Sequence, residues 1–211
     1  MKSICTLTSK KAADRILRCY ALQNKKLEAL LVSEKSQLIL MADYNQLMNQ
    51  RIIKASGKMS NNSLSENKGA FFKSVIGTMN HIMVGDILWL KRFSTHTSAY
   101  ASLKSINGLK KPEKLDVILF SDLASFKEER ARLDNTLIEW CNELKEGDID
   151  KPLKYTNFKG EAHNKRLGDL ILHVFLHQIH HRGQVSTLLS QEGIDFGETD
   201  LPEIVPDESQ A

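Results

Sequence analysis

Two histidines spaced four residues apart are the first residues in this chain that could do chemistry. His177 and His181 belong to a group of four histidines within nine residues, which also holds His173 and His180. On a helix, side chains at i and i+4 project from one face, so both imidazoles could bind one metal ion at about 2.0–2.1 Å per nitrogen. Burying two unpaired imidazoles among apolar residues is costly, and a metal removes that cost. Hydrogen bonds in the core would also remove it, so the pair alone leaves both interpretations open.

A third histidine, His81, favours the metal. It lies midway along a predicted helix, with Gly77 and Gly85 at i−4 and i+4 on the same face. Glycine inside a helix costs roughly 0.5–1 kcal/mol relative to alanine, so two glycines around one histidine suggest that space is needed there. The space could hold a metal ion, its water molecules and a substrate, or it could let two helices pack closely.

We expect His81, His177 and His181 to bind one divalent transition metal ion. Three neutral imidazoles leave coordination positions open, which is typical of a catalytic site. Nitrogen ligands suit Zn or Ni, with Fe, Co, Mn and Cu as alternatives. Such an ion lowers the pKa of bound water and could supply hydroxide or activate a thiol. Position 178 is glutamine, so the H-E-x-x-H pattern is absent and a zincin-type protease is disfavoured.

Three further residues are predicted to act beside the metal. Asp86 could orient an imidazole or accept a proton. Arg182 could bind an anionic group of the substrate, although an ordinary ion pair would explain it equally well. His173 lies one turn before His177 and could approach the metal or form part of the pocket wall.

Long helices must position these side chains. Only four prolines occur in 211 residues, so long stretches of the chain can stay helical. Apolar residues at three- and four-residue spacing predict four helices, at about residues 36–56, 70–93, 121–144 and 166–191. We therefore expect an all-α, up-down four-helix bundle in which inward side chains build the site.

The connections between these helices differ in length. Residues 94–116 form a long connection between the second and third helices, and residues 153–160 predict a short hairpin before the fourth. His96 and His163 fall in predicted loops, where we expect them to be exposed.

The charge distribution divides the chain into three segments. Residues 1–35 hold eight Lys or Arg and three Asp or Glu, whereas the rest of the chain holds 21 and 23. We expect a basic N-terminal extension at 1–35, the helical bundle at 36–200 and an acidic tail at 201–211. The extension could pack on the bundle, mediate assembly or be an added segment. Because the body of the chain is slightly acidic, nucleic-acid binding is not expected.

Composition favours a cytoplasmic protein. Cys5, Cys19 and Cys141 are odd in number and form no C-x-x-C pair, which is typical of a reducing compartment. No apolar run approaches the ~18–20 residues of a membrane span, and no apolar segment of a secretory signal follows Lys2. We therefore expect no membrane partner.

Two segments resemble the DinB (damage-inducible) family. Residues 71–93 are similar to its second helix, and residues 173–184 read H-x-x-x-H-x-x-H-H-R-G-Q, like that family's last helix. The resemblance extends over about residues 38–200. The sequence departs from the family pattern at Leu176, where asparagine is common, and at Ile179, where threonine is common.

The resemblance implies a four-helix bundle, often a homodimer, with a tri-histidine metal site. Carried over by motif, the ligands are His81, His177 and His181. Related branches include metal-dependent thiol S-transferases and hydrolase-like members. The family name reflects induction by DNA damage and not a DNA chemistry.

Three hypotheses are consistent with these patterns. The first is a metal-dependent enzyme that activates a low-molecular-weight thiol or water for attack on a small electrophile, with Asp86, His173 and Arg182 positioning the reactants. The second is a non-catalytic, metal-dependent stress-response or ligand-binding module. The third is a plain helical protein whose histidines form hydrogen bonds. Metal analysis of the purified protein separates the third hypothesis from the other two.

Overall fold

The computed structural model describes residues 33–207 of the chain. The predicted basic extension at residues 1–35 therefore lies almost wholly outside the described residues, as does the end of the predicted acidic tail at 201–211. The division of the chain into three segments stays a prediction.

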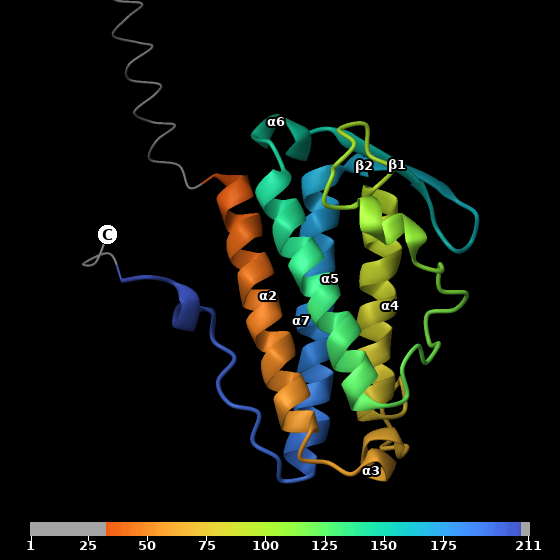
Figure 1. The fold of residues 1–211 in the computed structure, drawn as a ribbon, viewed down its shortest axis with the longest axis vertical. Coiled ribbons are helices and arrows are strands. Elements are labelled where there is room, and N and C mark those ends of the chain that lie inside the picture. The colour runs from red at the N-terminus through yellow and green to blue at the C-terminus, as the bar shows by residue number, and fades with distance from the viewer. Residues whose placement is uncertain (1–32, 208–211) are drawn as a thin grey trace, which may run out of the picture. The chain divides into compact units, whose positions relative to one another are not determined.

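Four long helices pack side by side (Figure 1). They are α2 (Glu34–Ser56), α4 (Val75–Phe93), α5 (Leu123–Glu143) and α7 (Leu167–Gln191). The mostly helical fold with four main helices, predicted from apolar spacing, is confirmed.

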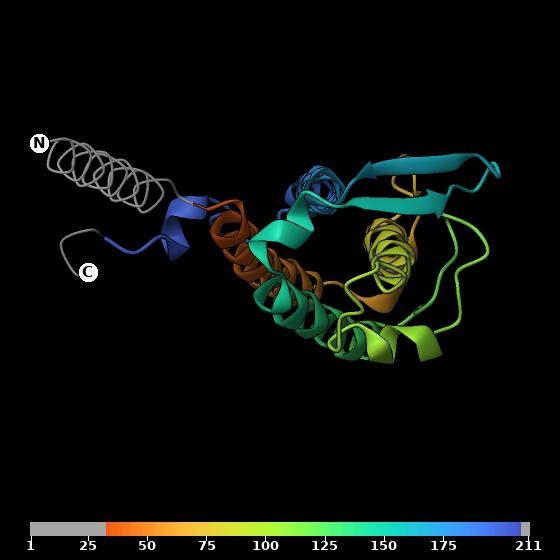
Figure 2. The same ribbon diagram turned by 90° about the horizontal axis from the view of Figure 1, so that it is seen from above.

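The helices are arranged as two antiparallel pairs, α2 with α5 and α4 with α7. Viewed from above, α2 lies between α5 and α7, and α4 lies on the far side of those two helices (Figure 2). In contrast, α4 and α5 run parallel, as the contacts of Asp86 with Arg130 and of Phe93 with Trp140 show. The long connection between these helices returns along the bundle, so the chain does not reverse direction at that step (Figure 1).

Shorter elements connect the helices. The predicted hairpin is confirmed as two antiparallel strands in which Tyr155 pairs with His163. The segment after α2 forms a short helix that begins at the capping residue Ser60. The short elements are α3 (Asn61–Ser65), η1 (Lys104–Gly108), α6 (Glu146–Ile149), β1 (Pro152–Thr156), β2 (Ala162–Arg166) and η2 (Leu201–Ile204).

The start of α4 is set by two residues just before it. Lys73 has a φ of 69°, a left-handed conformation that does not continue a helix. Ser74 then caps the helix, because its hydroxyl accepts a hydrogen bond from the Gly77 amide at 3.0 Å. The helix therefore begins at Val75, and the predicted start at residue 70 is wrong.

An aromatic and aliphatic core fills one end of the bundle. Trp140 and Phe93 are fully buried and stack with ring centroids 4.6 Å apart, and Tyr100 packs edge-on against Trp140 at 5.7 Å. Fully burying an apolar side chain contributes about 1.5–3 kcal/mol, so this end of the bundle can fix the helices that carry the site. No helix within residues 33–207 is long and apolar enough to span a bilayer.

The segment after α7 lies along α2 (Figure 1). The Tyr44 hydroxyl donates a hydrogen bond to the Thr199 carbonyl at 2.6 Å, and Arg51 forms an ion pair with Glu203. These contacts cover part of the outer face of α2.

Candidate metal centre

Three histidine rings converge between α4 and α7. Nε2 of His81 lies 3.1 Å from Nε2 of His177 and 3.2 Å from Nε2 of His181. Nitrogens that each lie about 2.0–2.1 Å from one ion are roughly 2.9–3.4 Å apart at octahedral or tetrahedral angles. The three residues predicted as ligands therefore form a cluster that could hold one metal ion.

Hydrogen bonds fix the protonation of two of these rings. Nδ1 of His81 lies 2.8 Å from the Leu115 carbonyl oxygen, and Nδ1 of His181 lies 2.8 Å from Oε1 of Gln184. Both oxygens can only accept, so both Nδ1 atoms carry a proton. In a neutral imidazole the other nitrogen, Nε2, then holds a free lone pair. Each Nε2 therefore points a lone pair at the centre of the cluster.

The environment keeps the rings neutral. Burial, followed by the neighbouring His181 and His81, lowers the pKa of His177 to about 3. Burial also lowers the pKa values of His81 and His181, although their hydrogen bonds to Leu115 and Gln184 act in the opposite direction. Neutral imidazole is the form that binds a metal.

The two glycines near His81 have different roles. A Cβ at Gly85 would lie 2.9 Å from Cε1 of His177, so this glycine makes room for a ring of the cluster. A Cβ at Gly77 would instead lie 2.2 Å from the Phe72 carbonyl oxygen. The interpretation of Gly77 as space for the site is therefore wrong, because its small size serves the turn before α4.

Phe72 forms a wall of the cluster. Its ring stacks on His81 at 3.7 Å between centroids and meets His181 edge-on at 5.5 Å. The neighbouring Phe71 is 87% exposed. One side of the cluster therefore presents apolar surface.

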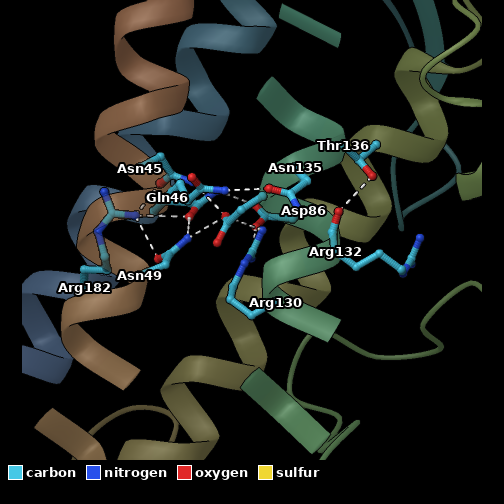
Figure 3. A network of polar contacts seen from close by, with 11 residues as sticks. Asn45, Gln46, Asn49, Asp86, Arg130, Arg132, Asn135, Thr136 and Arg182 are labelled. Atoms are coloured by element: carbon cyan, nitrogen blue, oxygen red, sulfur yellow. Dashed lines mark hydrogen bonds and ion pairs between the residues drawn. The ribbon is translucent and has the colours of Figure 1, made fainter. Parts of the chain in front are cut away.

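Asp86 lies in a buried polar network (Figure 3) that shares helices α4 and α7 with the cluster. Its carboxylate accepts hydrogen bonds from Arg130 and, at 3.0 Å, from Nε2 of Gln178. Asp134 completes the network by facing Arg130 at 3.0 Å and accepting from Asn49 at 2.9 Å. Burial raises the pKa of Asp86 to about 6, and Arg130 opposes that rise. These contacts link α4, α5, α7 and α2, and the predicted catalytic role of Asp86 stays a prediction.

Arg182 lies in the same network and faces amide groups. Its guanidinium donates to the side-chain oxygens of Asn45, Asn49 and Gln178 (Figure 3). Burial lowers the pKa of Arg182 to about 10. This placement provides the guanidinium with three internal acceptors, and its predicted role in binding substrate stays a prediction.

The remaining histidines take three kinds of position. His173 is exposed, and its ring lies 6.0 Å from that of His177, which suits the predicted pocket wall. His180 is exposed. His96 is only 4% exposed and stacks on Tyr100, so its predicted surface position is wrong. His163 is half-buried in β2 and also departs from the expectation.

Gln178 and Arg130 are buried polar residues that were not among the predicted site residues. Gln178 is fully buried, whereas His177 beside it is only half-buried. The buried face of α7 therefore includes Gln178, and the His177 ring lies at its edge. The regular spacing of Arg130 with apolar residues of α5 was the available signal for its burial.

Comparison with known proteins finds a match over most of the chain. The profile described as DinB family matches residues 30–207. The protein named "Protein DinB" from Bacillus subtilis (strain 168) is 23% identical over 158 residues, which cover 75% of this chain and 87% of that protein. No solved structure matches the chain.

Proposed function

Because this chain belongs to the DinB family, we propose that His81, His177 and His181 bind one divalent metal ion and that the protein is a metal-dependent enzyme. The metal would activate a thiol or a water molecule for attack on a small electrophile. Zn or Ni is the preferred ion, and Fe, Co, Mn or Cu would suit the same nitrogen ligands.

The contact between His81 and His181 carries this proposal. Both rings hold their proton on Nδ1, so the two Nε2 atoms face each other at 3.2 Å with a lone pair on each. Lone pairs at that distance repel unless a cation lies between them. A proton could serve, but burial lowers the pKa of both rings. A metal ion satisfies all three Nε2 atoms at once.

The residues around the cluster support chemistry at an open ion. Bound there, a divalent ion with three neutral ligands supplies a Lewis acid that lowers the pKa of a coordinated thiol or water. Leu115 and Gln184 fix the ligand rings through their Nδ1 atoms. Phe72 covers one face of the His81 ring, and exposed His173 could accept a proton from the nucleophile.

A non-catalytic metal-dependent module is the second candidate. The observation that favours it is the placement of Asp86 and Arg182 inside the buried network. Asp86 accepts a hydrogen bond from Gln178, and Arg182 donates one to Asn45. Both side chains therefore have partners within the protein. If no residue besides His173 can transfer a proton, the cluster could hold a metal or a ligand without turnover.

Metal content and turnover test the proposal in sequence. The purified protein should contain close to one equivalent of a transition metal by elemental analysis, His177→Ala should lose it, and the exposed control His180→Ala should keep it. Loaded protein should then accelerate reaction of a thiol panel with a chromogenic electrophile. Metal without turnover would favour the non-catalytic module, and no metal in any preparation would reject both.

Assembly and location belong to the same proposal. We propose that the protein is cytoplasmic and forms a homodimer. An apolar row on the outer face of α7 supports the dimer. Leu172, Leu176 and Ile179 lie at i, i+4 and i+7 and are 47%, 55% and 38% exposed. A second copy of the chain could cover this row. Nucleic acid is not a proposed partner.

A further inference from the structure

Arg92 differs from every other arginine that the structure describes. Within residues 33–207, four arginines form ion pairs with carboxylates, and Arg182 donates to amide oxygens. Arg92 has neither kind of partner among the described residues. Its guanidinium carbon instead lies 4.5 Å from the centroid of Trp89 and 5.0 Å from that of Tyr155.

The two rings hold the guanidinium in place without neutralising it. Cation–π contacts are worth about 0.5–2 kcal/mol and leave the N–H groups free to donate. Arg92 is half-buried, so its charge is less screened than that of an exposed arginine. A second positive charge lies nearby, because Lys165 acts on His173 in the same direction as Arg92 does. The shelf formed by Trp89, Arg92 and Tyr155 is therefore a preformed place for an anion.

This shelf is connected to the metal centre by a row of rings. The His173 ring lies 6.0 Å from His177 and 5.2 Å from Trp89. Arg92 also follows His81 by three helical turns, so both residues lie on one face of α4, about 16 Å apart along the axis. A molecule with one end at the cluster could therefore reach the guanidinium with its other end.

The metal centre and the shelf at Arg92 would both carry positive charge. A divalent ion on three neutral imidazoles would keep its full charge. The carboxylate of Asp116 interacts electrostatically with His81, but it is exposed to solvent. The unpaired guanidinium adds to this positive field. Complementary substrates are therefore anionic.

We propose that Arg92 is a specificity-determining residue that binds a carboxylate or phosphate group of the substrate while the reacting atom lies at the metal. This inference rests on the proposed function, and it restricts the small-molecule substrate to extended, anionic molecules. Arginine suits the task because its planar fork binds an oxyanion through two parallel hydrogen bonds.

Thiol binding to the Co(II)-loaded protein tests this inference without turnover. Thiolate coordination to Co(II) gives a charge-transfer band, and three probes are titrated: glutathione, its diethyl ester and 2-mercaptoethanol. Arg92→Gln should weaken glutathione binding about 10- to 100-fold, as expected for a lost charged hydrogen bond. Binding of the ester and of 2-mercaptoethanol should change less than about twofold. Arg92→Lys should recover part of the affinity, because it keeps the charge without the fork.

The control is Arg132→Gln, which removes an arginine that pairs with Glu129 on α5 and should leave all three affinities unchanged. Equal weakening of acid and ester by Arg92→Gln, or no weakening, would overturn the inference. Failure of every thiol to give a band in the wild-type protein would count against the proposed function instead.

A metal-free measurement keeps the inference testable in that case. Trp89 is half-buried beside Arg92, whereas Trp140 is fully buried. Titration with glutarate should therefore change tryptophan emission through Trp89 in the wild-type protein and not in Arg92→Gln. An identical response of the two proteins would reject the anion shelf.

Discussion

The imidazole of His177 packs directly on the backbone of Gly85, so closely that a Cβ at position 85 would lie 2.9 Å from Cε1 and 3.3 Å from Nδ1 of that ring. The ring cannot move away freely, because its Nε2 lies 3.1 Å from Nε2 of His81. The close approach of α4 and α7 at this point therefore sets the position of one candidate ligand.

Gly85→Ala should separate metal affinity from helix stability. The added methyl group favours the helix by roughly 0.5–1 kcal/mol but displaces the His177 ring. We expect a folded protein whose metal affinity, measured by competition with a chelator, falls about 10-fold or more. The matched control is Gly183→Ala on α7, where a Cβ would meet nothing within 4 Å. An unchanged affinity in Gly85→Ala would show that the ring position does not matter.

The hydrogen bond from His181 to Gln184 predicts a second effect on the metal. Gln184→Ala removes the acceptor that holds the proton on Nδ1 of His181, so the ring can rotate or change tautomer. Loss of such a supporting group typically costs 10–100-fold in metal affinity, and we expect a value of about that size. Gln191→Ala, at the exposed end of α7, is the control. Equal affinities of the two variants would contradict the predicted role of Gln184.

Much of this arrangement could be predicted from the sequence, because it depends on helical periodicity. The i and i+4 spacing of His177 and His181 defines one face of a helix whatever packs against it. The position of His81 within a long apolar helix predicted the third ring. The hairpin before α7 was predicted from its own short pattern.

Other features depend on contacts that periodicity does not encode. The left-handed conformation of Lys73 makes α4 begin later than predicted. Gly77 is required by the turn at Phe72 and not by the site. The burial of His96 follows from stacking on Tyr100 in a connection that has no helical pattern. The tautomer of His81 depends on the Leu115 carbonyl, which is distant in sequence. Such long-range pairs become visible only in three dimensions.

Arg130 should be the most sensitive charged residue for folding. It is buried between the carboxylates of Asp86 and Asp134, so Arg130→Met leaves two buried acids without their cation. Removing one partner of a buried pair costs about 3–5 kcal/mol, measured as the free energy of unfolding in urea at pH 7. Arg132→Met on the same helix removes a more exposed pair with Glu129 and should cost less than about 1 kcal/mol. Equal losses would show that the buried network does not stabilise the bundle.

Asp148 should make the stability of the protein depend on acid pH. Hydrogen bonds from Lys151 and Ser98, at 2.7 Å and 2.8 Å, lower the pKa of Asp148 to about 2. Because this folded-state pKa lies below the unfolded value of about 3.9, the stabilisation is complete above pH ~4 and is lost as the pH falls toward 2.

Comparison of Asp148→Asn with the wild-type protein measures that contribution. The Lys151 side chain is 52% exposed, so solvent screening reduces the effect to about 1 kcal/mol at pH 6. The difference in unfolding free energy should shrink toward zero near pH 2. Asp43→Asn, at an exposed position on α2, is the matched control for the loss of one carboxylate. A difference for Asp148→Asn that stays constant between pH 6 and pH 2 would contradict the assignment to this carboxylate.

The apolar row on α7 predicts the assembly state. Leu176 is 55% exposed at the centre of the row, between Leu172 and Ile179, and a glutamate there would place a charge inside the proposed interface. Removing a buried apolar side chain and burying an unpaired charge each cost several kcal/mol. We therefore expect Leu176→Glu to sediment as a monomer at micromolar concentrations at which the wild-type protein is a dimer. Ile118→Glu changes a comparably exposed residue, 48% exposed and outside the α7 row, and should leave the dimer intact. A wild-type protein that stays monomeric at high concentration would rule out this interface.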